Sequence, residues 1–212
     1  MLIIENLCYK NILRNINFSV KLGELALVCG ENGSGKTTLF NILSGIKQQS
    51  SGKIFLDDRE LSSIPLCQRS ALIANVLQDP RQGTIENMTI FENLCIAFFR
   101  GKKHTMALPN NELHNYFKHR LALLHIGLEN RLSEYVGNLS GGQRQCLSLM
   151  MATLANFRLL LLDEVTAAVD SKTSPILLNY SRAMLKEKSA CGLLISHDKE
   201  FIATFTGAIL NL

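Results

Sequence analysis

The sequence has no tryptophan, only four prolines and no closely spaced pair among its six cysteines. Neither a C-x-x-C pair nor a metal-like histidine spacing occurs, which predicts reduced, buried thiols in a cytosolic protein rather than disulfides or a metal cluster. No run of about 18 uncharged apolar residues is present, so we expect a chain that does not span a membrane by itself. The first residues show no basic region or cleavage site, so we expect no signal peptide.

The sequence also has no large excess of charge of one sign. The 212 residues are 47% hydrophobic and 19% charged, which is typical of a globular protein of one domain, or one domain with a lobe. The net charge is only +4, and the Lys and Arg residues are scattered, so no nucleic-acid partner is expected. The one basic cluster, residues 100–104, is more typical of a solvated loop.

One glycine-rich stretch, residues 30–38, organises the chain. It follows an apolar run at 25–29 and precedes a segment with helical spacing at 39–43, and it fits the phosphate-loop pattern G-x-x-x-x-G-K-[ST]. Its backbone N–H groups and the following helix N-terminus form an anion site. An ordinary glycine-rich turn would explain fewer of these features. We therefore predict nucleotide binding by Asn32, Gly33, Ser34, Gly35, Lys36, Thr37 and Thr38, with Lys36 on the β- and γ-phosphates and Thr37 on magnesium.

Strands and helices alternate along most of the chain. We predict strands over residues 2–9, 16–20, 25–29, 54–56, 72–77, 158–162, 192–195 and 207–212, and a turn at 50–53. Helices are predicted from capping boxes at Thr89 and Ser140, from Pro109 to Gly127, and from Asp170 to about residue 186. This order predicts an α/β fold in which residues 86–155 form a helical lobe inserted into a core of residues 1–85 and 156–212.

Acidic, amide and imidazole side chains stand at the ends of predicted buried strands. Asp163 is placed to hold magnesium, and Glu164 to act as general base on a water aimed at the γ-phosphate. Gln78 offers an amide to the metal or the water, and His197 an imidazole to the γ-phosphate. Taken alone, each of these residues could be an ordinary polar residue at a strand end or, for His197, a structural histidine. The phosphate loop upstream favours one nucleotide site that contains them all.

A second helix N-terminus carries two glycines and a hydroxyl, at residues 139–143. One nucleotide needs one phosphate loop, so this end is predicted to bind the γ-phosphate held by a second copy, in an isologous head-to-tail dimer. The alternative is an ordinary capped helix.

Together these segments resemble the ATP-binding subunit of ABC (ATP-binding cassette) transporters. Six family motifs occur in order: the phosphate loop, the Q-loop at Gln78, the LSGGQ signature, the acidic pair, a D-loop ending at Asp170 and a switch histidine, His197. The resemblance implies a RecA-like P-loop NTPase core with an N-terminal antiparallel β subdomain, and MgATP held between two copies. It also implies adenine stacking on Tyr9 and nucleotide contacts from Ser140, Gly141, Gly142 and Gln143.

A closer likeness is to bacterial uptake systems of the tryptophan or tyrosine type, carried by residues 78–94, 139–154 and 163–170. It implies a homodimer on the inner face of the cell membrane, with an integral permease and a substrate-binding protein as partners. Val165 and Ala167 depart from the family pattern in the D-loop, and no C-terminal regulatory tail is expected.

Two other functions stay open at this point. A soluble ABC ATPase acting on ribosomes or DNA usually has two cassettes or a long coiled-coil insertion, and neither occurs here. The other open function is a nucleotide-binding switch with little turnover. The altered D-loop favours this function, whereas the presence of Glu164 and His197 argues against it. The solute itself is not encoded in this subunit.

Overall fold

The computed structural model describes residues 1–100, 111–167 and 169–212. Three features predicted from the sequence fall wholly or partly outside this range: most of the basic cluster at 100–104, the helix start at Pro109, and Ala168 of the D-loop. Within the described residues the predicted α/β class is confirmed, with an antiparallel sheet followed by a parallel one.

Two sheets account for the strands. The antiparallel sheet has the order β2-β1-β4-β5 and consists of β1 (Leu2–Tyr9), β2 (Leu13–Val20), β4 (Ser51–Leu56) and β5 (Arg59–Glu60). The parallel sheet has the order β6-β7-β8-β3-β9 and consists of β3 (Leu25–Cys29), β6 (Ile73–Val76), β7 (Leu159–Asp163), β8 (Cys191–Ile195) and β9 (Ile209–Asn211). The strand that leads into the phosphate loop, β3, therefore lies inside the parallel sheet.

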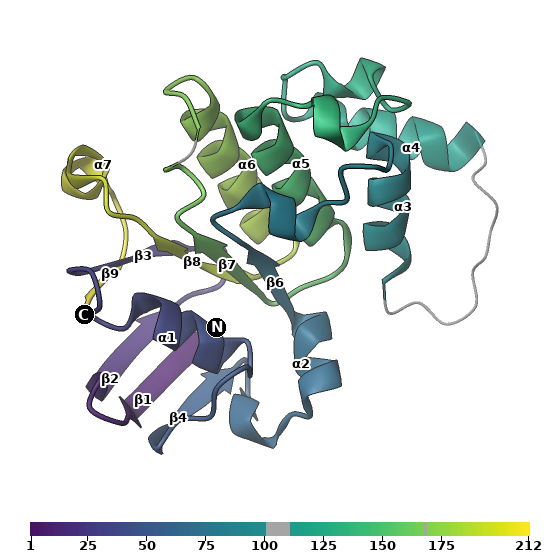
Figure 1. The fold of residues 1–212 in the computed structure, drawn as a ribbon. Coiled ribbons are helices and arrows are strands. Elements are labelled where there is room, and N and C mark those ends of the chain that lie inside the picture. The colour runs from purple at the N-terminus through teal and green to yellow at the C-terminus, as the bar shows by residue number, and fades with distance from the viewer. Residues whose placement is uncertain (101–110, 168) are drawn as a thin grey trace.

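Helices cover both faces of the parallel sheet. They are α1 (Lys36–Leu43), α2 (Leu66–Leu72), α3 (Ile90–Phe99), α4 (Asn111–Ala122), α5 (Gly141–Leu154), α6 (Thr173–Glu187) and α7 (Lys199–Thr204). Short 3-10 turns occur at Leu61–Ser63, Pro80–Gly83, Leu128–Asn130 and Val136–Asn138. Figure 1 shows α1 on one side of the parallel sheet, beside the antiparallel sheet, and α5 and α6 on the other side.

The strand β7 shows why a wholly apolar run is needed here. Successive side chains of a strand point to opposite faces, so a strand covered on both sides must be apolar at every position. Leu159 and Leu161 pack with α1 and the antiparallel sheet, whereas Leu160 and Leu162 pack with α5 and α6. All four are 0% exposed. The two hydrophobic cores are thus separated by one sheet, which holds β7 and its neighbours rigidly.

This rigid sheet brings polar residues to one edge. Parallel strands have their carboxyl ends on the same side, where α/β proteins bind their ligands. β3 ends just before Gly30, and β7 ends at Asp163 beside Ile195, the last residue of β8. β6, which pairs with β7, ends two residues before Gln78.

Three local predictions were wrong. The helix expected to end at Gly127 ends at Ala122, and Leu124 and Leu128 are buried in the turns that follow. The turn expected at 50–53 is mostly strand, because β4 begins at Ser51 and pairs with β1. The helix α2 was not predicted. It is a single short segment whose only buried residue is Arg69, so it has no apolar period to detect.

None of the helices in the described ranges is both long and apolar enough to cross a bilayer.

The carboxylate of Asp57 joins the two sheets. It accepts a hydrogen bond from Arg158 Nε at 2.7 Å, just before β7, and one from the Met1 amine at 2.6 Å. Burial opposes its ionisation, but these donors outweigh burial and hold the pKa of Asp57 below its usual value.

We expect Asp57→Asn to lower the free energy of unfolding at pH 7 by about 1 kcal/mol, since the contact is partly solvated. A depressed folded-state pKa stabilises the protein above the unfolded pKa, about 4, and this stability is lost as the pH falls through the lower folded value. Urea unfolding from pH 7 to pH 3 measures both effects, with the neighbouring Asp58→Asn as control. An equal loss in both variants at pH 7 would contradict the assignment.

Candidate active site

The phosphate loop has the backbone that its glycines permit. Gly30, Gly33 and Gly35 have φ values of 147°, 84° and 107°, which L side chains rarely adopt. A Cβ on Gly35 would lie 2.7 Å from Leu13 Cδ2, so this glycine also lets the β1–β2 hairpin pack on the loop. At Gly33 a Cβ would meet nothing within 4 Å, which leaves open space on that side of the loop.

Lys36 is the first residue of α1 and is only 5% exposed. Its ammonium donates to the carbonyl oxygens of Gly30 at 2.9 Å and Glu31 at 2.7 Å. The loop therefore wraps around this cation and holds it at the N-terminus of α1. Cation and helix end together favour an anion at the same place.

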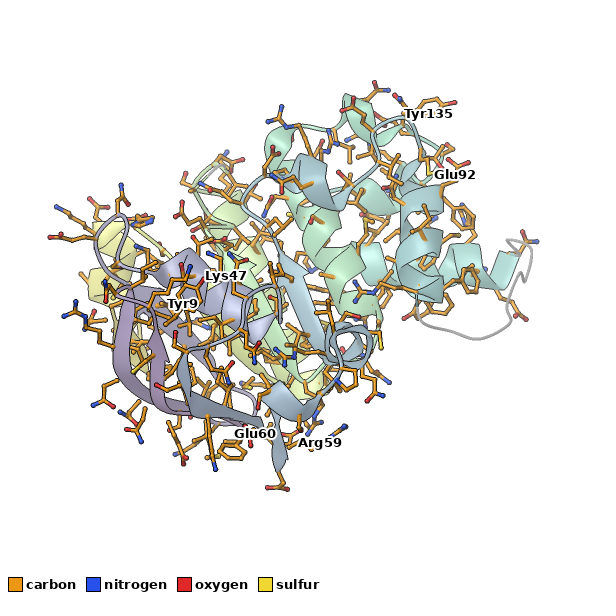
Figure 2. All side chains as sticks on the ribbon, turned by 60° about the horizontal axis from the view of Figure 1, so that its bottom comes forward. Tyr9, Lys47, Arg59, Glu60, Glu92 and Tyr135 are labelled. Carbon is orange, nitrogen blue, oxygen red and sulfur yellow. The ribbon has the colours of Figure 1, made fainter. Side chains whose placement is uncertain are left out.

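Tyr9 ends β1 on the hairpin that contacts the phosphate loop. Its ring lies 5.4 Å from the ammonium of Lys10 and 5.6 Å from that of Lys47, measured to the ring centroid. Figure 2 shows Tyr9 and Lys47 next to each other, and Lys47 follows α1 in the chain. Sequence reasoning singled out Tyr9 but missed Lys47, because nothing local in the sequence links these two positions.

Glu164 lies between Gln78 and His197. The amide Nε2 of Gln78 donates to Glu164 Oε2 at 2.9 Å, and His197 Nε2 lies 2.7 Å from Glu164 Oε1. These three residues follow the ends of β6, β7 and β8. Gln78 and Glu164 are 86 residues apart in the sequence. The structure therefore brings together the three side chains that the sequence suggested for catalysis.

The backbone at Glu164 is strained. Its φ is 49°, in the left-handed region that a non-glycine residue rarely adopts. Its N–H donates to Ile195 O at 3.2 Å, and its carbonyl accepts from Ala167 N at 2.9 Å. Such strain persists only where the surroundings enforce it, and it is concentrated at functional sites.

The three predicted magnesium ligands share one hollow. Thr37, Gln78 and Asp163 line a cavity of about 560 Å³ beside α1. A hydroxyl, an amide oxygen and a carboxylate are the hard oxygen ligands that magnesium prefers, so the donor set fits this ion. Burial, together with the nearby Glu164 carboxylate, raises the pKa of Asp163, and the proximity of His197 and Lys36 only partly offsets this. A metal cation would relieve the same repulsion.

We expect the Asp163 carboxyl to destabilise the fold, although the proposed metal site requires it. A carboxyl with a raised folded-state pKa destabilises the fold at pH values above its unfolded pKa of about 4. Asp163→Asn should therefore raise the melting temperature of the nucleotide-free chain by about 2–4 °C at pH 8 while lowering ATP hydrolysis. The gain should shrink toward pH 4. Thermal unfolding in chelator at both pH values measures this, and a lower melting temperature at pH 8 would contradict it.

The signature segment forms the start of α5. Ser140 is the N-cap and accepts from Gln143 N at 3.3 Å, while Gln143 Oε1 accepts from Ser140 N at 3.2 Å, so the predicted capping box is present. A Cβ on Gly142 would lie 3.5 Å from Thr173 and 3.7 Å from Asp170 Oδ2. Among the hydrogen bonds of the described residues, none joins residues 140–143 to the phosphate loop. Ser140 and Gly141 are exposed.

Sequence reasoning missed three buried polar side chains that hold the segments on either side of Gln78: Asn93, Arg144 and Gln145. Asn93 is 0% exposed and bonds the backbone of Ile85 in both directions, at 2.8 and 2.9 Å. Polar residues inside an otherwise apolar helical pattern are the signal that could have identified them.

Comparison with known proteins identifies the family of this chain. The model of the ABC transporter family matches residues 13–167. The tyrosine transport ATP-binding protein of Clostridioides difficile (strain R20291) is 38% identical over 201 residues, which cover 95% of this chain and 80% of that protein. The putative hemin import ATP-binding protein HrtA of Staphylococcus aureus (strain Newman) is 32% identical over 202 residues, covering 92% of this chain and 86% of that protein.

Solved structures share the fold. The structure of cbiO1 from Clostridium perfringens, part of the ABC transporter complex cbiONQ, has a TM-score of 0.78 and 26% identity, over 93% of this chain and 78% of that one. A dimeric ATP-binding cassette in a post-hydrolysis state, bound to ADP and Pi, has a TM-score of 0.82 over 100% of this chain and 94% of that one. At 24% identity, this second likeness shows the fold alone. The chain belongs to the ABC transporter family, as an ATP-binding subunit that hydrolyses ATP.

Proposed function

We propose that two copies of this chain hydrolyse MgATP at shared sites and drive uptake of a solute through a separate membrane permease. The observation that carries the proposal is the Glu164 carboxylate, held between Gln78 and His197 at the sheet edge that also bears Lys36 and Asp163. A carboxylate, an imidazole and a buried ammonium at one edge suit attack of water on a terminal phosphate.

Each side chain has a distinct task in this proposal. Glu164 accepts the proton of the attacking water, and His197 holds Glu164 in place and donates to the γ-phosphate. Lys36 neutralises charge on the β- and γ-phosphates, together with the loop N–H groups of residues 32–38. Thr37, Gln78 and Asp163 would hold magnesium, which supplies charge neutralisation at the phosphates when it is bound. Tyr9 stacks on adenine.

The second half of each site comes from the other copy. Ser140, Gly141, Gly142 and Gln143 offer an exposed helix N-terminus that is not bonded to the phosphate loop of its own chain. We assign residues 86–155 to a helical lobe that carries this end and residues 1–85 and 156–212 to the nucleotide-binding core. In a two-fold dimer, the lobe of one copy then faces the loop of the other.

The lobe also offers a surface for the permease. A hollow of about 570 Å³ lies next to the Gln78 segment, lined by Leu77, Gly83, Ile96, Phe99 and Met151, among others. Ile96 is 49% exposed, which is high for a large apolar side chain, and it lies on the partly exposed face of α3. The relatives named for tyrosine transport and hemin import support the uptake of a solute. As further parts of the proposal, the chain works at the inner face of the membrane with a substrate-binding protein as another partner.

Steady-state phosphate release by the purified chain tests hydrolysis, with Lys36→Ala as the blank. We expect magnesium-dependent release by the wild type and none above background by the variant. Co-purification with a multi-span membrane protein tests the transport assignment. Phosphate release by the wild type no faster than that by Lys36→Ala would contradict ATP turnover. This result would favour the nucleotide-binding switch that the altered D-loop suggested.

A further inference from the structure

Gln145 is a buried polar residue of α5 whose side-chain amide is only half satisfied. It is 1% exposed, its Nε2 donates to Leu77 O at 3.1 Å, and its Oε1 is buried without a hydrogen-bond partner in the described residues. A half-satisfied buried amide destabilises a fold relative to an apolar side chain of similar size. The residue that it grips, Leu77, directly precedes Gln78.

Arg144, the residue before Gln145, contacts the C-terminal end of the loop that carries Gln78. Its Nε donates to Thr84 Oγ1 at 2.7 Å, and its Nη1 lies 3.3 Å from Glu86 Oε2. The Thr84 hydroxyl in turn donates to Pro80 O at 2.8 Å. Arg144 and Gln145 of α5 therefore hold the two ends of the loop that carries Gln78. A shift of this loop would displace α5 or break these hydrogen bonds.

The two ends of this connection serve different nucleotides if the proposed dimer is right. Gln78 contacts Glu164 of its own chain, at 2.9 Å. The N-terminus of the same α5, at Ser140, faces the nucleotide bound by the partner. The path from Glu164 through Gln78, Leu77 and Gln145 to α5 thus runs from one ATP site to the other.

We propose that Gln145 is a positioning residue that couples the two ATP sites of the dimer, by tying the Gln78 loop to the helix that contacts the second nucleotide. This inference rests on the proposed function. When Gln78 moves as nucleotide binds in one site, the hydrogen bond to Leu77 displaces α5 and presents Ser140 to the other site. Coupling of this kind appears as cooperativity in ATP concentration.

The test compares Gln145→Met with Thr153→Val in the full-length chain, by measuring the rate of phosphate release against ATP concentration. Thr153 is a matched control, because it lies on α5, is 0% exposed and bonds Leu149 O and the Tyr180 hydroxyl rather than the Gln78 loop. We expect the wild type and Thr153→Val to share a Hill coefficient well above one, and Gln145→Met to fall to about one. Affinity of each monomer for a fluorescent ATP analogue should stay within about twofold of wild type.

Thermal unfolding separates coupling from simple damage. Gln145→Met removes the unpartnered Oε1 but also the donor to Leu77 O, and these opposing effects should keep its melting temperature within a few degrees of the wild type. Gln145→Asn, which keeps the amide but withdraws it by one methylene, should also reduce the Hill coefficient. A wild-type Hill coefficient in both Gln145 variants would overturn the proposal, as would a wild type that hydrolyses ATP with a coefficient of one. A wild type without turnover would instead contradict the proposed function.

Discussion

Glu164→Gln should lower steady-state ATP hydrolysis by about 10²- to 10⁴-fold, the usual contribution of a general base, while leaving ATP binding intact. Glutamine has nearly the same shape and can still contact Gln78 and His197, but it cannot take a proton from water. Because the nucleotide then persists, ATP should hold two copies together. Phosphate release, equilibrium binding of ATP and size-exclusion chromatography with and without ATP measure the three effects.

The matched control for this variant is Glu31→Gln, which removes an exposed side-chain carboxylate from the phosphate loop and leaves in place the Glu31 carbonyl that Lys36 bonds. Its rate of hydrolysis should stay close to that of the wild type. Hydrolysis by Glu164→Gln at the wild-type rate would contradict the base assignment. Loss of ATP binding in this variant would show that Glu164 acts on the nucleotide rather than on water.

Gly142→Asp should lower hydrolysis by about 10²- to 10³-fold, as expected when stabilising groups around a reacting phosphate are lost. The added carboxylate would stand at the exposed start of α5, where the partner's γ-phosphate is proposed to lie, and would repel it. A Cβ has room at this position, because its nearest atoms, on Thr173, are 3.5 Å away, and Asp170 Oδ2 lies at 3.7 Å. An acidic residue in the first turn of a helix also suits the helix dipole, so the fold should persist.

ATP binding by the monomer distinguishes this effect from damage to the phosphate loop. Gly142→Asp should bind ATP as the wild type does and fail only to dimerise and hydrolyse. Ser133→Asp, which adds the same charge at an exposed position of the lobe, is the control and should hydrolyse normally. Weakened ATP binding by dilute Gly142→Asp monomers would place the signature in the site of its own chain.

Much of the fold follows from local patterns in the sequence. The apolar run at 159–162 is buried on both faces of the sheet, and the boxes at Thr89 and Ser140 cap α3 and α5 as predicted. These features depend on neighbours within one turn of helix or on alternate residues of one strand. For the same reason the fixed spacing of the phosphate loop predicted its backbone correctly.

What the sequence could not show are contacts between distant residues. The bonds from Gln145 to Leu77 and from Arg144 to Thr84 span 68 and 60 residues. A polar residue inside the apolar pattern of α5 can indicate burial, but it does not identify its partner. The end of α4 at Ala122 was missed because Leu124 and Leu128 stay buried after the helix stops, which imitates a continuing apolar period. The placement of Gln78 against Glu164 likewise required the order of strands in the sheet.

The shared site is the central claim, and complementation between two inactive variants tests it most directly. In a 1:1 mixture of Lys36→Ala and Gly142→Asp, half of the pairs that meet at random contain one chain of each kind. Such a dimer has one damaged site and one site with an intact Lys36 from one chain and an intact Gly142 from the other. The mixture should therefore recover up to about a quarter of the wild-type rate of phosphate release. A rate no higher than the mean of the two variants measured separately would show that each chain builds its site alone.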